Sequence, residues 1–252
     1  MAKIMSVHSF RGGTGKSNTT ANLAALLALR GLRVGVIDTD IMSPGIHVLF
    51  GVGEHEMVHS LNDYLWGEVD VEETAVDVTR VLNGKGTDHS AIFLIPCSMK
   101  TGDIARVLRE GYDVGLLNDG YQRLIQKLQL DALLIDTHPG LNEETLLSIA
   151  ISDVLAIVLR PDSQDYQGTA VTVEVARKLD VPHLMLVVNK TPMAFGLDIV
   201  KERVQKAYNA DVAAVLPHSD EMMTLASDGI FVLRYPDHQM TQLLESVADR
   251  VA

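Results

Sequence analysis

Cysteine is almost missing from the sequence, which contains only Cys97 among its 252 residues. One thiol excludes an intramolecular disulfide and a metal site built from several cysteines of one chain. No apolar run approaches the roughly 18–20 residues of a membrane span, and the first ten residues lack the apolar core of a secretory signal peptide. From these absences we expect a soluble protein of the cytoplasm.

Basic residues are also scarce relative to acidic ones. The chain has 21 Lys and Arg against 33 Asp and Glu, a formal net charge of −12. Such an excess repels the phosphates of nucleic acids and anionic lipids. No dense run of Lys or Arg compensates for it, so the composition does not support DNA binding.

What the sequence does contain is an alternation of short β-branched runs and amphipathic stretches. The predicted strands are Lys3–Ser9, Arg33–Asp38, Ala91–Pro96, Ala132–Asp136, Val154–Leu159, His183–Asn189 and Val212–Leu216. The predicted helices between them are Asn18–Leu29, Asn118–Leu130, Glu143–Ile151 and Tyr166–Leu179. Most of the strands are apolar throughout, which is typical of parallel strands buried on both faces.

This alternation predicts an α/β fold, with a doubly wound, mostly parallel sheet flanked by helices in three layers. The length and the 47% hydrophobic content suit one domain over residues 1–252. Ligands of such sheets bind at the carboxyl ends of the strands. The segment 51–90 is less regular, and we expect it to form excursions around that edge.

A glycine-rich segment follows the first predicted strand and reads Phe10-Arg11-Gly12-Gly13-Thr14-Gly15-Lys16-Ser17. Glycines let backbone N–H groups reach phosphate oxygens, a lysine neutralises their charge, and a hydroxyl ligates Mg²⁺. The helix that follows points its positive end at the anion. The dinucleotide fingerprint fits poorly, because Asn18 stands where its last glycine belongs. The segment from Arg11 to Asn18 is therefore a predicted phosphate-binding loop.

The strict P-loop pattern is broken, since Phe10 occupies the place of its first glycine. Arg11-Gly12-Gly13 instead resembles the deviant Walker A loop of the MinD/ParA family, whose usual form begins with Lys. Further segments resemble the family's later motifs in the same order, so the resemblance extends over nearly the whole chain. These segments are Val36–Asp40, Leu134–Gly140, Val187–Lys190 and Val215–Pro217.

The resemblance implies binding of Mg-ATP. Lys16 would neutralise phosphate charge, and Ser17 would bind Mg²⁺ directly. Asp136 would hold the metal through water, although a carboxylate before Thr-His-Pro-Gly also suits a turn.

Asp38 and Asp40 are expected at the same site. Asp40 would position the attacking water and Asp38 would support the metal shell, with the division between them open. Asn189 and Pro217 would flank the base, with a strand-end cap as the alternative for Asn189.

The resemblance implies catalytic roles for Lys16, Asp40 and Arg11. The family's usual lysine at the Arg11 position reaches across a dimer to the partner's nucleotide. Arginine keeps the charge and adds a planar fork suited to phosphate oxygens. Arg11 could equally be a solvated loop residue in a protein without trans-activation. His138 could be a mobile switch residue, but an ordinary turn histidine is the preferred interpretation.

The function implied by the resemblance is a switch in which Mg-ATP gates formation of a homodimer. Slow hydrolysis, stimulated by an unidentified protein partner, would release it, and the switch would position or partition a cellular cargo. The alternative is an ATP-dependent small-molecule synthetase of the same superfamily. A metal-cluster carrier fits poorly, since a dimer shares only two copies of Cys97 and a bridging cluster takes four thiolates.

The last predicted helix, Gln239–Ala252, is amphipathic but carries acidic residues on its polar face. Anionic lipid attracts basic faces, so we expect no membrane anchor here. Docking on the domain is the expected use of its apolar side, which holds Met240, Leu243, Leu244, Val247 and Val251.

Overall fold

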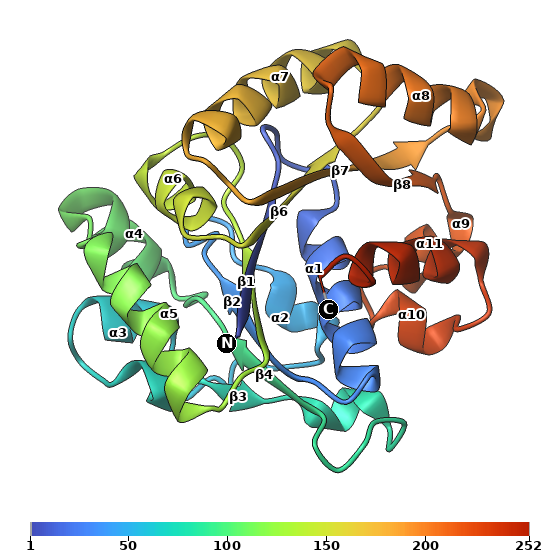
Figure 1. The fold of residues 1–252 in the computed structure, drawn as a ribbon. Coiled ribbons are helices and arrows are strands. Elements are labelled where there is room, and N and C mark those ends of the chain that lie inside the picture. Colours follow the sequence, from blue (N-terminus) through green and yellow to red (C-terminus); the bar gives the residue numbers. More distant parts are fainter. Residues whose placement is uncertain (1, 252) are drawn as a thin grey trace.

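The computed structural model describes residues 2–251, which form an eight-stranded sheet between two layers of helices (Figure 1). The strand order is β3-β4-β2-β5-β1-β6-β7-β8, and every neighbouring pair is parallel except β3 with β4. The strands are β1 (Lys3–His8), β2 (Arg33–Asp38), β3 (Val76–Asp77), β4 (Ala91–Ile95), β5 (Ala132–Asp136), β6 (Val154–Leu159), β7 (His183–Thr191) and β8 (Asp211–Pro217). The predicted fold class is confirmed.

The seven strands predicted from the sequence all form, with ends within two residues of the prediction. β3 was missed, because two residues are too short to carry a hydrophobic period. It lies within the segment 51–90, which otherwise contains short helices. These are α3 (Leu61–Leu65) and the 3₁₀ turns η1 (Val71–Thr74) and η2 (Thr79–Leu82).

Helices cover both faces of the sheet, with one hydrophobic cluster under the helices of one face and two clusters under those of the other. One face carries α1 (Lys16–Leu29), α2 (Ile46–Leu49), α10 (Phe231–Arg234) and α11 (Gln239–Ala248). The other carries α3, α5 (Gly115–Lys127), α6 (Glu143–Ala150), α7 (Ser163–Lys178) and α8 (Leu197–Tyr208). The remaining elements are α4 (Thr101–Glu110), α9 (Asp220–Leu225) and η3 (Met193–Phe195).

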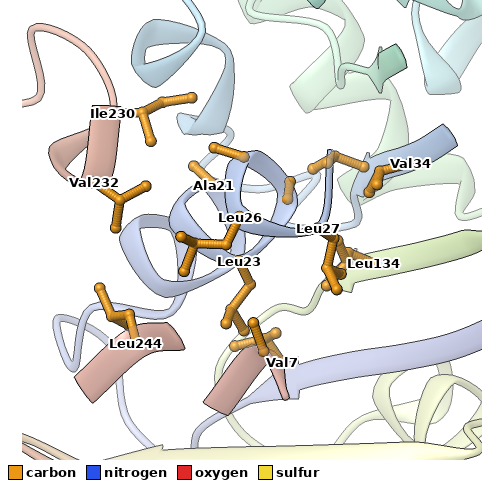
Figure 2. Packing of buried hydrophobic residues seen from close by; sticks show 14 of the residues in the cluster. Val7, Ala21, Leu23, Leu26, Leu27, Val34, Leu134, Ile230, Val232 and Leu244 are labelled. Carbon is orange, nitrogen blue, oxygen red and sulfur yellow. The ribbon is translucent and has the colours of Figure 1, made fainter. Parts of the chain in front are cut away.

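Helix α1 is buried on two sides, which explains why its sequence is apolar nearly all round. Figure 2 shows Leu23, Leu26 and Leu27 between the sheet and the C-terminal helices. Leu134 of β5 lies on the sheet side, and Leu244 of α11 lies on the other. A helix enclosed in this way is fixed in position, and so is the loop at its N-terminus.

The C-terminal helix docks on the domain, as the sequence predicts. α11 packs against α1 and β8, and its apolar residues belong to the same cluster as α1, with Met240, Leu244 and Val247 buried and Leu243 partly buried. Val251, three residues after the end of the helix, is buried in the same cluster. Within residues 2–251, no helix combines the length and apolar character needed to cross a membrane.

Candidate nucleotide site

The glycine-rich loop joins β1 to α1 at the centre of the sheet, where the strand order changes direction. Crevices of parallel sheets open at such points, at the carboxyl ends of the strands. Gly15 caps α1 with a φ of 101°, which L side chains rarely adopt. A Cβ there would also lie 2.4 Å from Nδ2 of Asn189. Glycine is therefore required at this position by both backbone and neighbours.

Lys16 is buried at the first position of α1, with 7% of its surface exposed. Its Nζ donates to Ser9 Oγ at 3.1 Å, and Ser9 Oγ donates to Arg11 O at 2.6 Å. Burial lowers the pKa of Lys16, while the charges of nearby aspartates oppose that shift. An ammonium group inside a glycine-rich loop is suited to neutralising an anion.

Two side chains at the end of β7 hold the loop from the other side. Asn189 Nδ2 donates to Thr14 O at 2.8 Å, and Lys190 Nζ donates to Gly13 O at 2.9 Å. Because a trans peptide points its N–H opposite to its carbonyl, the next N–H groups face away from β7. The Asn189 carboxamide also accepts from Lys190 N at 2.8 Å, so it is engaged with the protein itself, and its contact with a base stays a prediction. Lys190 is a loop-holding residue that sequence reasoning missed.

Asp38 ends β2, Asp40 follows it, and the two make different contacts. Both oxygens of buried Asp38 accept backbone N–H groups, from Asp40 at 2.9 Å and Gly45 at 3.2 Å. This carboxyl group therefore shapes the loop that carries Asp40. Asp40 accepts from Ser43 N at 3.2 Å and lies 3.7 Å from His138 Nε2.

The carboxyl groups of this region crowd one another in a buried setting. Burial raises the pKa of Asp136 to about 6, against hydrogen bonding from Ser17 and the charge of Lys16. Burial and the charge of Asp136 raise the pKa of Asp38 well above its usual range. Burial also raises the pKa of Asp40, while His138 and Lys16 lower it. Such crowding is relieved by a bound cation.

A cavity of about 370 Å³ opens over the loop, and we call it the lysine cavity after Lys16. It brings together the predicted site residues Gly12, Gly13, Gly15, Lys16, Ser17, Asn18 and Asp40. Ser43, His138, Pro139 and Lys190 complete it. Thr14, Asp38 and Asp136 are buried and are not part of this lining.

A second cavity of about 460 Å³ adjoins the first, sharing Gly15, Asn18 and Lys190 with it. We call it the methionine cavity, after Met222, Met223 and Met240 in its lining. It contains the predicted site residues Asn189 and Pro217. An apolar cavity beside a polar one matches a ligand with a flat apolar end and a charged end.

Helix α9 forms one wall of the methionine cavity and is loosely held. None of its residues is buried, and Met223 is 65% exposed. Two consecutive non-glycine residues, Ala226 and Ser227, end it with φ values of 49° and 66°. Left-handed backbone of this kind costs energy in L residues and is often found at ligand clamps.

The start of the loop is anchored on α7. The Phe10 ring covers Gly168, where an added Cβ would lie 2.0 Å from Phe10 Cδ1. Arg11 Nη1 lies 3.6 Å from Asp165 Oδ1 and 3.8 Å from Asp162 Oδ1. The Arg11 side chain is 39% exposed and pairs within its own chain. Any contact with a partner's nucleotide therefore requires Arg11 to leave these two carboxylates.

The residues present fit a magnesium nucleotide better than a bare metal ion. Residues 2–251 contain no group of three or more His, Cys, Asp or Glu side chains arranged to hold a metal. Mg²⁺ in phosphate-binding sites takes few protein ligands and several oxygens from substrate phosphates and water. Ser17, with Asp136 behind it, supplies that minimal set.

Fold and site together define a P-loop NTPase of MinD/ParA type. The family model described as ParA, NUBPL iron-transfer P-loop NTPase, matches residues 1–252. The chain belongs to this family.

Individual relatives are distant but similar over most of their length. An uncharacterised ATP-binding protein of Methanocaldococcus jannaschii is 25% identical over 252 residues, covering 100% of this chain and 88% of the relative. The iron-sulfur cluster carrier protein of Pseudomonas fragi is 29% identical, covering 90% and 76%. The septum site-determining protein MinD of Pyrococcus horikoshii, solved with Mg-ADP, has a TM-score of 0.78 and 22% identity, covering 100% and 96%.

Proposed function

We propose that this protein binds Mg-ATP in the two adjoining cavities and uses it to gate formation of a homodimer. The phosphates would occupy the lysine cavity, and the adenine base would occupy the methionine cavity. The observation that carries the proposal is the junction of the two cavities at Gly15, Asn18 and Lys190. It gives a nucleotide one continuous path from buried Lys16 to an apolar wall.

Within this proposal each site residue has a role drawn from the family resemblance. Lys16 neutralises phosphate charge, Ser17 and Asp136 hold Mg²⁺, and Asp40 positions the attacking water. Asp38 supports this arrangement through the loop that it holds. Mg²⁺ held there would neutralise charge on the phosphate oxygens. Arg11 would reach the partner's nucleotide after leaving Asp162 and Asp165.

The dimer would be the active state of a switch that positions or partitions a cellular cargo. Hydrolysis would be slow and stimulated by a partner protein, and ADP would release the dimer. The MinD relative supports a positioning role.

A second candidate, transfer of an iron–sulfur cluster, is suggested by the family description and by the Pseudomonas relative. The cysteine argues against it. Cys97 is 0% exposed and donates to Asp38 O at 3.0 Å, and its burial raises the pKa of the thiol. A cluster needs exposed thiolates.

The test is the molar mass in solution with Mg-ADP and with Mg-ATP. We expect wild type to shift from monomer to dimer in Mg-ATP, Asp40→Ala to remain trapped as a dimer, and Arg11→Ala to stay monomeric. The same molar mass with Mg-ADP and with Mg-ATP would contradict the nucleotide-gated dimer and favour the small-molecule synthetase. Iron bound by the purified protein would favour the cluster carrier.

A further inference from the structure

Two side chains from different loops meet in the lysine cavity. Asp40 follows β2 and His138 follows β5, and both line the cavity with Lys16. Nε2 of His138 lies 3.7 Å from Oδ1 of Asp40, and the two side chains are 28% and 19% exposed. His138 belongs to the segment Leu134–Gly140 that resembles a family motif.

The orientation of the His138 ring is fixed by its other nitrogen. Nδ1 lies 2.6 Å from Pro139 O. A carbonyl oxygen only accepts, so Nδ1 carries the proton in this contact. In the neutral ring Nε2 is then an acceptor. The backbone of Pro139 therefore turns an acceptor toward Asp40.

Hydrogen bonds within its own loop also hold Asp40. Its own N–H donates to Asp38 Oδ1 at 2.9 Å, and Oδ1 accepts from Ser43 N at 3.2 Å. The two acceptors, His138 Nε2 and Asp40 Oδ1, are thus each held by their own loop. At a separation of 3.7 Å, one water molecule can lie about 3 Å from both and donate a hydrogen to each.

We propose that His138 is a second water-positioning residue beside Asp40 in hydrolysis of the terminal phosphate of ATP. The inference rests on the proposed ATPase function. The water oxygen bonds to the terminal phosphorus, and the bond from that phosphorus to the bridging oxygen breaks with its electron pair going to ADP. The water's protons leave on inorganic phosphate and to solvent. His138 and Asp40 only orient the water, so that a lone pair of its oxygen is free to attack.

The two ring nitrogens can be tested separately because glutamine and asparagine each preserve one of them. His138→Gln carries an amide group to the place of Nε2, near Asp40. His138→Asn carries one only to the place of Nδ1, near Pro139 O. His138→Ala removes both. A purely structural role in the turn would be rescued by Asn, whereas a role toward the water would be rescued by Gln.

The first measurement is single-turnover hydrolysis of Mg-ATP by wild type and the three variants. We expect the rate to fall about tenfold or more in Ala and Asn and to stay within about threefold of wild type in Gln, with the affinity for Mg-ADP unchanged in all. In an Asp40→Ala background, His138→Ala should cause no further fall in the rate, because the water is no longer positioned once Asp40 is removed.

The second measurement needs no turnover: the affinity for Mg-ADP with aluminium fluoride, which mimics the transferring phosphate and its water. Ala and Asn should weaken binding of this complex relative to Mg-ADP alone, and Gln should not. Equal behaviour of all variants, or rescue by Asn instead of Gln, overturns the role of His138. A wild type that binds Mg-ATP without hydrolysing it overturns the proposed ATPase function itself.

Discussion

The two ends of the candidate site are built in opposite ways. The lysine cavity is lined by charged groups and glycines that backbone and side-chain hydrogen bonds hold in place. The methionine cavity is largely apolar, and one wall is a helix without a buried residue. Local stability follows buried contacts and satisfied hydrogen bonds. The comparison indicates a rigid end that fixes the charge of the ligand and a pliable end that adapts to its apolar part.

The largest expected effect lies at the rigid end. Lys16→Ala removes the buried ammonium group from the loop, and we expect the affinity for Mg-ATP to fall at least about a hundredfold, because charge neutralisation in a buried site is lost. Titration calorimetry with Mg-ATP measures it. Lys3→Ala, an exposed lysine of β1, is the matched control for the loss of one positive charge.

If Lys16→Ala lowered nucleotide affinity no more than substitution of a methionine on α9, the contrast between the two ends would be refuted. The affinity would then come mainly from the apolar end, and the lysine cavity would not be the anion site. The unfolding transition of Lys16→Ala must first show that the variant is folded, because both outcomes assume a native structure.

The two ends also differ in how far the sequence predicts them. Gly15, Lys16 and Ser17 are neighbours in the chain, so a local motif specifies them, and the structure places them together. Lys190 and His138 were missed because their contacts join distant parts of the chain. Lys190 donates to Gly13 O, 177 residues away, and His138 lies beside Asp40, which is 98 residues earlier (138 − 40). No local pattern records such contacts.

The methionine cavity was predicted least. Its walls come from α1, β7, β8, α9 and α11, and a methionine in a sequence reads simply as a core residue. Only Asn189 and Pro217, through the family resemblance, indicated where it lies. The left-handed Ala226 and Ser227 could not be foreseen, because nothing in their side chains favours that backbone.

The second prediction concerns the anchor of the rigid end on α7. Gly168→Ala places a Cβ only 2.0 Å from Phe10 Cδ1, which is a steric clash. We expect a loss of about 1–3 kcal/mol of stability from overpacking, together with weaker binding of Mg-ADP, because Phe10 begins the loop. Denaturant unfolding and ligand titration measure the two effects.

The Phe10→Ala background should reduce this loss. Without the ring, alanine at 168 escapes the contacts at 2.0 and 2.3 Å and keeps only the one at 2.8 Å with the Cβ of residue 10, so the destabilisation should be smaller than in wild type. Destabilisation of the same size in both backgrounds would show that Phe10 does not anchor the loop.

A smaller effect is expected at the pliable end. Met223→Ser exchanges an exposed thioether of the cavity wall for a hydroxyl, and we expect Mg-ADP to bind roughly fivefold more weakly, since about 1 kcal/mol of apolar contact is lost. Met193→Ser is the matched control, because Met193 is similarly exposed but lies on η3, outside the cavity lining.

Stability should hardly change in either variant, as both methionines are largely exposed. A loss at Met193 as large as that at Met223 would refute the assignment of the base to this cavity. A hundredfold loss at Met223 would show that the wall is not pliable and would erase the contrast with Lys16.

The last effect is a pH dependence at the charged end. Burial and the charge of Asp40 raise the pKa of Glu144 from 4.5 to about 7. Between these values the folded state binds more protons than the unfolded chain, so the stability of nucleotide-free protein falls as pH rises from about 4.5 to 7. Glu144→Gln should flatten that part of the profile, with a melting temperature a few degrees above wild type at pH 8 and equal to it at pH 4. Glu143→Gln changes an exposed neighbour in the same helical turn, and a profile flattened equally by both would trace the effect to the net charge of α6 rather than to crowding around Asp40.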